Sequence, residues 1–151
     1  MESAEMTAGR MHILRLDPGE DVLISVEKFL AEQDICQAVV LGGYGTLRAY
    51  HLHWVTHNRI PSENSFGRGQ DGIEILSMNG LVVESKPHIH ITLSTEEGAF
   101  GGHLEQGCIA YVLCEIYFAE IEGVDLNRST AHVYVPGIGE GDISRLSFGS
   151  R

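Results

Sequence analysis

Basic residues are scarce in this sequence: 10 Lys and Arg stand against 21 Asp and Glu, and no two basic residues are adjacent. The formal net charge is -11 at pH 7. Nucleic-acid binding draws most of its sequence-independent affinity from clustered Lys and Arg that neutralise phosphates. Attraction to an anionic membrane surface needs a similar cluster. The charge balance therefore argues against a nucleic acid and against a membrane as partners.

Cysteine is also scarce and odd in number. Cys36, Cys108 and Cys114 lie in apolar runs, where a free cysteine behaves as a small hydrophobic residue, so we expect no disulfide framework. The first ten residues contain no apolar core of signal-peptide length, and no stretch approaches the roughly 18 apolar residues of a membrane span. These absences together predict a protein of the reducing cytoplasm.

Proline occurs only 4 times, no low-complexity run interrupts the 151 residues, and this length is typical of one domain. The letters DPGE at 17–20 predict the start of a helix, with Asp17 as N-cap, Pro18 at the first helical position and Glu20 closing a capping box. Apolar residues then recur at helical spacing from Val22 to Leu30. One face of this helix is expected to pack on a sheet.

The chain after this helix is rich in β-branched and aromatic residues broken by glycines. One helix among several β-rich segments, joined by short loops, favours an α+β domain with a mainly antiparallel sheet. The letters LGGYGT at 41–46 lack the helix and lysine of a phosphate-binding loop and predict a tight turn between strands. The expected strands are residues 35–43, 46–55, 72–83, 87–94 and 108–121.

Composition divides the chain into three regions. Residues 1–10 are expected to be an N-terminal extension, residues 11–122 the folded domain, and residues 123–151 a polar and glycine-rich C-terminal tail with one short strand at Ala131–Val135. Within the domain, the polar segment from His57 to Asp71 predicts a long surface loop, and such loops are often functional.

Histidines form the strongest chemical pattern. In a strand, residues two apart project from one face, so His88 and His90 of PHIHITLS point together while Ile89 and Ile91 point to the opposite side. A hairpin centred between residues 96 and 97 would place His103 opposite His90, because both are equally far from that centre. Three neutral imidazoles would then converge with a fourth position left for water or substrate, which is typical of catalytic zinc.

Other interpretations of these histidines remain open. The H-x-H pair could form a solvated polar face, with His103 capping a turn, and a glycine bulge near the hairpin would shift His103 by one position. A second alternating set, His51, His53 and His57, could form a competing or additional site. Spacing alone does not decide among these alternatives.

Two acidic residues interrupt apolar strands. Glu115, between Leu113 and Tyr117, is a candidate catalytic residue, either as general base on a metal-bound water or as hydrogen-bond acceptor for a ligating imidazole. Its alternative role is a structural carboxylate paired with an arginine such as Arg48. For Glu74 we expect a structural hydrogen bond.

Several segments of the sequence, and their order along the chain, resemble the plant- and prokaryote-conserved (PPC) domain. They are LGGYGTLRAYHLHWV, GIEILSMNGLV, PHIHITLS, GGHLEQG and the strand of Glu115, spanning about residues 10 to 122. The resemblance implies a PPC-like α+β fold, a homotrimer, and a zinc ion held by the residues that match the family's ligands, His88, His90 and His103.

The same resemblance also suggests a second class of function, which is DNA binding or protein assembly. Plant members carry AT-hook segments before the domain and assemble in the nucleus, and many bacterial members carry a DNA-binding label. This chain lacks an Arg-Gly-Arg-Pro hook, for which Gly67-Arg68-Gly69-Gln70 is a poor substitute. Two hypotheses follow: a trimeric zinc protein that acts on or senses a small molecule, or a DNA-binding or protein-assembly module in which the metal is structural. The sequence leaves open whether the protein is an enzyme.

Overall fold

The computed structural model describes residues 1–149 and confirms an α+β fold that is mostly antiparallel sheet. Within these residues, α1 (Val22–Glu32) is the one α-helix. No helix in this range is long and apolar enough to cross a membrane. The strands are β1 (Thr7–Leu16), β2 (Ala38–Val55), β3 (Asn64–Gly69), β4 (Ile73–Val83), β5 (Lys86–Thr95), β6 (Gly98–Leu104), β7 (Ile109–Glu122), β8 (Asp125–Val135) and β9 (Gly139–Gly149).

The main sheet is curled around the long strand β2. Its order is β1-β7-β2-β4-β5-β6, and β3 pairs with β2. The first part of β2 pairs with β4 and β7, while its last residues pair with β3 and β6. Since β2 contacts both β4 and β6, the strands β2, β4, β5 and β6 form a closed circuit. This circuit carries the histidines described below.

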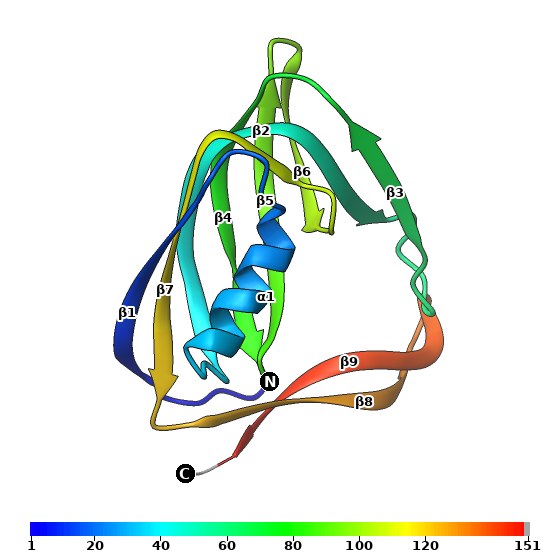
Figure 1. Ribbon diagram of the computed structural model, residues 1–151. Helices are drawn as coiled ribbons and strands as arrows, with labels where there is room; N and C mark the ends of the chain where they lie inside the picture. Colours follow the sequence, from blue (N-terminus) through cyan, green and yellow to red (C-terminus); the bar gives the residue numbers. More distant parts are fainter. Residues whose placement is uncertain (150–151) are drawn as a thin grey trace.

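The main core lies between the curled sheet and α1 (Figure 1). On the helix side, the buried residues are Val22, Val26 and Leu30, which confirms the helical spacing read from the sequence. On the sheet side, they include Ile89 and Ile91 of β5. Because residues alternate along a strand, burying these two isoleucines turns their histidine neighbours outward.

The helix begins later than the sequence predicted. Asp21, rather than Asp17, is the N-cap, and its carboxylate accepts a hydrogen bond from the Ile24 amide at 3.1 Å. The segment before it forms a separate turn, closed by the Glu20 carboxylate that accepts from the Asp17 amide at 2.7 Å. Gly19 within this turn has a φ of +94°, a left-handed conformation that a right-handed helix does not contain.

The prediction of a tight turn at LGGYGT was wrong, because these residues lie inside β2, a continuous strand of 18 residues. Bulges against β7 lie between Val40 and Gly42 and between Gly45 and Leu47. Gly45 has a φ of +142°, and a Cβ atom there would clash with the backbone of Leu113. The glycines therefore let β2 bend and approach β7 closely instead of reversing the chain.

The two chain ends contain more strand than expected. The segment Ala131–Val135 lies inside β8, which forms a hairpin with β9, so the region after residue 123 has two long strands instead of one short one. At the other end, β1 begins at Thr7, within the expected extension. The polar segment 57–71 is likewise not all loop, since it contains β3.

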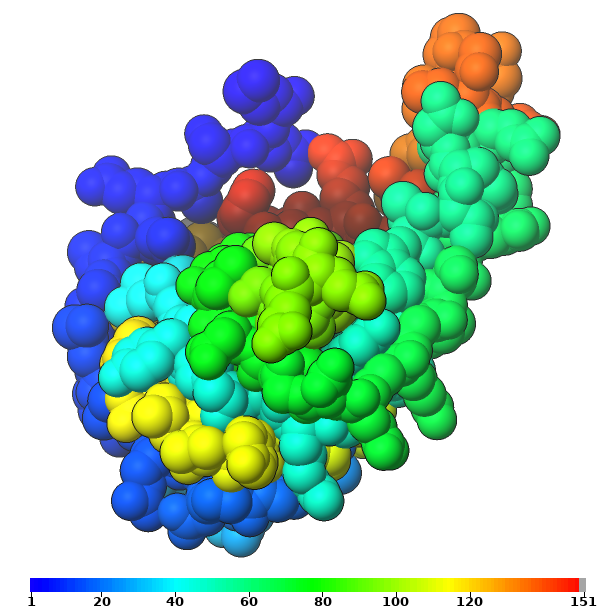
Figure 2. Space-filling model, turned by 90° about the horizontal axis from the view of Figure 1, so that it is seen from above, coloured from blue at the N-terminus to red at the C-terminus, as the bar shows by residue number. Residues whose placement is uncertain are grey.

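The β8–β9 hairpin is attached to the rest of the chain at both of its ends. Its base shares a small apolar cluster with the sheet, made by Val83, Ile121, Val124 and Leu126. At its tip, the Ile60 amide donates to the carbonyl of Ile138 at 3.2 Å. Figure 2 shows this tip, in orange, against the loop that follows β2, in blue-green.

Candidate metal centre

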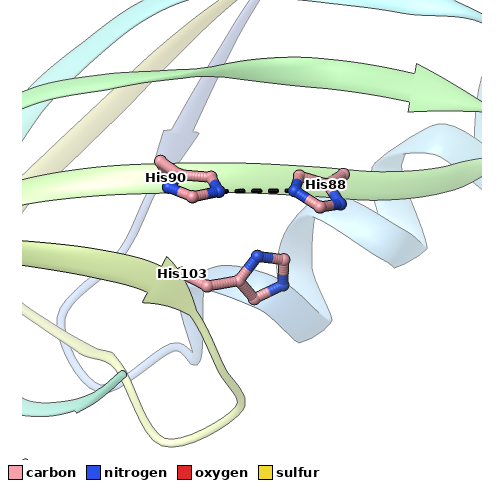
Figure 3. Close-up of side chains that lie close together, drawn as sticks. All are labelled: His88, His90 and His103. Carbon is pink, nitrogen blue, oxygen red and sulfur yellow. Dashed lines mark hydrogen bonds between the residues drawn. The ribbon is translucent and has the colours of Figure 1, made fainter. Parts of the chain in front are cut away.

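The predicted hairpin register is confirmed: His90 of β5 pairs with His103 of β6, and a two-residue turn at Glu96 and Glu97 joins the strands. His88 lies two residues before His90 on the same outward face. A ring nitrogen of His103 points toward the other two imidazoles (Figure 3). The sheet therefore brings the three predicted side chains together without help from a loop.

The spacing of the three rings suits one small cation. One ring nitrogen from each of His88, His90 and His103 lies within 4.8 Å of the others. The Nε2 atoms of His88 and His90 are 3.3 Å apart. Two nitrogens bound tetrahedrally to zinc at about 2.0–2.1 Å are separated by about 3.3 Å. The pair is thus already at the distance that a shared ion requires.

The surroundings keep two of these imidazoles neutral. Burial, together with smaller contributions from the nearby imidazoles of His88 and His53, lowers the pKa of His103 to about 4. Burial also lowers the pKa of His88, with a smaller contribution from the positive charge of Arg128 on β8. A neutral imidazole keeps the lone pair that a metal needs.

An open hollow of about 600 Å³ lies in front of the histidines. This volume is within the range of small-molecule sites, about 300–1,000 Å³. Its walls combine the imidazoles with apolar side chains and with glycines that expose backbone. The lining residues are His53, Trp54, Val55, His88, His90, Ile91, Thr92, Gly101, Gly102 and His103.

A fourth histidine, His53 of β2, lies beside the three candidate ligands. His53 pairs with His103 across the β2–β6 contact, and their rings stack with centroids 4.3 Å apart. The Nδ1 atom of His53 is 2.6 Å from a carboxylate oxygen of Glu105. One ligand atom from each of these three residues also lies within 4.8 Å of the others, which makes a second group able to hold a metal.

The sequence singled out His53 but not Glu105. The available signal was strand alternation, which puts Glu105 on the same side as His103 two residues earlier. His51 is separate from both groups, with Nδ1 lying 2.7 Å from the carbonyl oxygen of Gln106. His57 lies 3.7 Å from Glu63 near the end of β2.

Glu115 lies apart from the histidines, on β7 between β1 and β2. It accepts a hydrogen bond from the Tyr44 hydroxyl at 2.5 Å, and this bond raises the pKa of Tyr44 above its usual value. The expected partner Arg48 is thus replaced by a tyrosine. Glu115 is not among the residues that line the hollow. Glu74, for which a structural hydrogen bond was expected, is exposed.

The family model of the Plants and Prokaryotes Conserved (PCC) domain matches residues 3–122. Among curated proteins, the bifunctional protein GlmU of Synechococcus sp. (strain JA-3-3Ab) is 30% identical over 112 residues, covering 74% of this chain and 17% of GlmU. The chain therefore spans less than a fifth of that relative.

Solved structures resemble the whole fold. A plant- and prokaryote-conserved protein of Pyrococcus horikoshii and a metal-containing protein of Archaeoglobus fulgidus are each 26% identical, with TM-scores of 0.72 and 0.70; each match covers 93% of this chain and 96% of theirs. A "putative dna binding protein" of Bacteroides thetaiotaomicron is 18% identical, with a TM-score of 0.69 and the same coverage. At that identity the last likeness shows the fold alone.

Proposed function

Since the chain belongs to the Plants and Prokaryotes Conserved (PCC) domain family, we propose that it binds one divalent ion, zinc first, through His88, His90 and His103. We further propose that it is a cytoplasmic homotrimer that acts on or senses a small molecule in the hollow beside the ion. The 3.3 Å separation of the His88 and His90 Nε2 atoms carries the metal proposal.

The donor set fits zinc better than a hard cation. Neutral imidazoles suit zinc, copper, iron and nickel, whereas magnesium and calcium prefer oxygen ligands. Three protein ligands leave one coordination position for water or a ligand, and the exposure of His88 and His90 keeps that side accessible. A bound zinc ion would polarise a carbonyl or activate water there.

The hollow sets limits on the small molecule. Trp54 and Val55 offer exposed apolar surface on one side. Trp54 lies over the glycines of β6, because its indole nitrogen donates to the carbonyl of Gly101 and a Cβ atom at Gly102 would meet its ring. A ligand with one oxygen directed at the ion and an apolar part against Trp54 matches this arrangement.

Metal analysis of protein purified without a histidine tag should give about one zinc ion per chain. His90→Ala should weaken zinc binding by at least about tenfold in calorimetric titration, because it removes one nitrogen of the close pair. His132→Ala is the matched control, since His132 is an exposed histidine on the hairpin paired with Asp142. A wild-type chain that takes up no divalent ion would refute the metal assignment.

An apolar surface on β7 supports self-association. Tyr111, Val112 and Leu113 are consecutive and all exposed, at 53%, 59% and 37%. Strand alternation would bury every second residue, so three exposed apolar residues in a row support the proposal that another copy of the chain covers this surface. Tyr44 on the neighbouring strand is also exposed.

We expect light scattering to give a mass of three chains of 16.6 kDa, and Val112→Glu to shift it to one chain, because the carboxylate would be buried without a partner. Ile143→Glu, at an exposed apolar position on β9, is the control and should leave the mass unchanged. A monomeric wild-type protein would contradict the assembly.

The charges give no support to DNA binding as the function. The net charge is -11, and several basic side chains are already paired with acids, among them Arg10 with Glu120 and Arg15 with Asp17. Phosphate contacts need basic side chains that are free to neutralise phosphates and so displace the counterions of the nucleic acid. The three unpaired cysteines, Cys36, Cys108 and Cys114, agree with a reducing compartment.

A further inference from the structure

The contact between His53 and Glu105 has no role in the proposed zinc site. Their side chains are 19% and 28% exposed, so both are more enclosed than the exposed His88 and His90. The ring of Phe66 lies 5.4 Å from that of His53 and covers one side of it. An imidazole and a carboxylate are thus held 2.6 Å apart in a sheltered position beside His103.

We propose that His53, His103 and Glu105 form a second position for a divalent ion, alternative to the one at His88, His90 and His103. Two nitrogens and one carboxylate oxygen make the His₂Glu donor set of some catalytic zinc sites. Tetrahedral zinc holds two of its ligand atoms about 3.3–3.5 Å apart. Ligand atoms within 4.8 Å of one another reach that separation when the side chains rotate toward a common point.

The two positions exclude each other. His103 belongs to both groups, and a neutral imidazole has one lone pair, its other nitrogen being protonated. One ion per chain is therefore expected in total. The position with Glu105 differs in charge, because the carboxylate offsets one positive charge of the ion, and its oxygen tolerates harder ions such as Mn²⁺ better than a third imidazole does.

The second position shares His103 with the proposed zinc site but needs neither His88 nor His90, so a double variant separates the two. His88→Ala/His90→Ala changes two exposed side chains and should leave the fold intact, which circular dichroism and thermal unfolding would check. Titration with Zn²⁺ and with Co²⁺, followed by calorimetry and by the visible absorption of cobalt, should still give one ion per chain, bound about 10- to 100-fold more weakly than by the wild type.

Adding Glu105→Gln to the double variant should weaken the remaining binding by at least about tenfold, whereas adding Glu97→Gln, an exposed carboxylate in the β5–β6 turn, should not change it. A double variant that binds no ion, while the wild type binds one, would overturn the second position and leave the first. If the double variant binds the ion as tightly as the wild type does, and adding Glu105→Gln removes that binding, the first position would be overturned and the second supported.

Discussion

We expect His103→Ala to abolish measurable divalent-ion binding, with a loss of at least about a hundredfold in affinity. His103 is the residue that both groups of metal-binding side chains share. His88→Ala or His53→Ala removes a ligand from one group only, so each of these variants keeps the other position. The measurement is calorimetric titration with Zn²⁺ on each single variant, beside the wild type.

The loss must be separated from unfolding, because His103 stacks on His53 and is half-buried. His103→Gln keeps polar volume at this position, and the melting temperatures of both variants would show whether the fold survives. His12→Ala provides a matched control, since His12 is also a partly buried histidine and contacts Glu120, away from the candidate metal centre. Zinc affinity within about threefold of the wild type in a folded His103→Ala protein would sink the shared-ligand model.

The residues of this site that the sequence predicted are those whose positions depend on nearby parts of the chain. His88 and His90 are fixed by alternation within one strand, and His103 by a hairpin whose turn lies only a few residues away. His53 joins these histidines through the β2–β6 pairing, about 50 positions along the chain from His103. Hydrophobic alternation does not determine such a non-local pairing, because it specifies the face of each strand and not its neighbour.

Two of the errors in the fold share a physical cause, which is the context dependence of glycine. In LGGYGT the glycines allow bulges and a close approach to β7, whereas the sequence alone equally allows a turn. After residue 135, glycines occupy the tight turn and the first residues of β9. Glycine gives the same signal in a turn, a bulge and a strand that passes close to another backbone.

The sheet topology also fixes the backbone positions of the three histidines before any ion is bound. His53, His90 and His103 lie on three adjacent strands of the closed circuit β2, β4, β5 and β6. Each strand is paired on both sides near the site, so its backbone does not need to move to bring the rings together. Preorganised ligands lose less conformational entropy on binding.

Attachment of the hairpin to this framework depends on one buried polar side chain, Gln37, which among residues 1–149 is the one polar residue in the buried class. Its amide nitrogen donates to the carbonyls of Ile121 and Val124 at 2.9 and 2.6 Å, and its oxygen accepts from the Leu126 amide at 3.0 Å. These three bonds hold the chain where it leaves β7 and enters β8. A residue without this donor and acceptor would leave three buried backbone groups unpaired.

Gln37→Leu should lower the free energy of unfolding by about 3–5 kcal/mol, because each unpaired buried group costs about 1–3 kcal/mol. The fall is measured by urea unfolding, and hydrogen exchange should show faster exchange of the Leu126 amide as the hairpin base loosens. Gln70→Leu, at an exposed glutamine, should change stability by less than about 0.5 kcal/mol. If Gln37→Leu were no less stable than Gln70→Leu, the packing of Val124 and Leu126 rather than the glutamine would hold the hairpin in place.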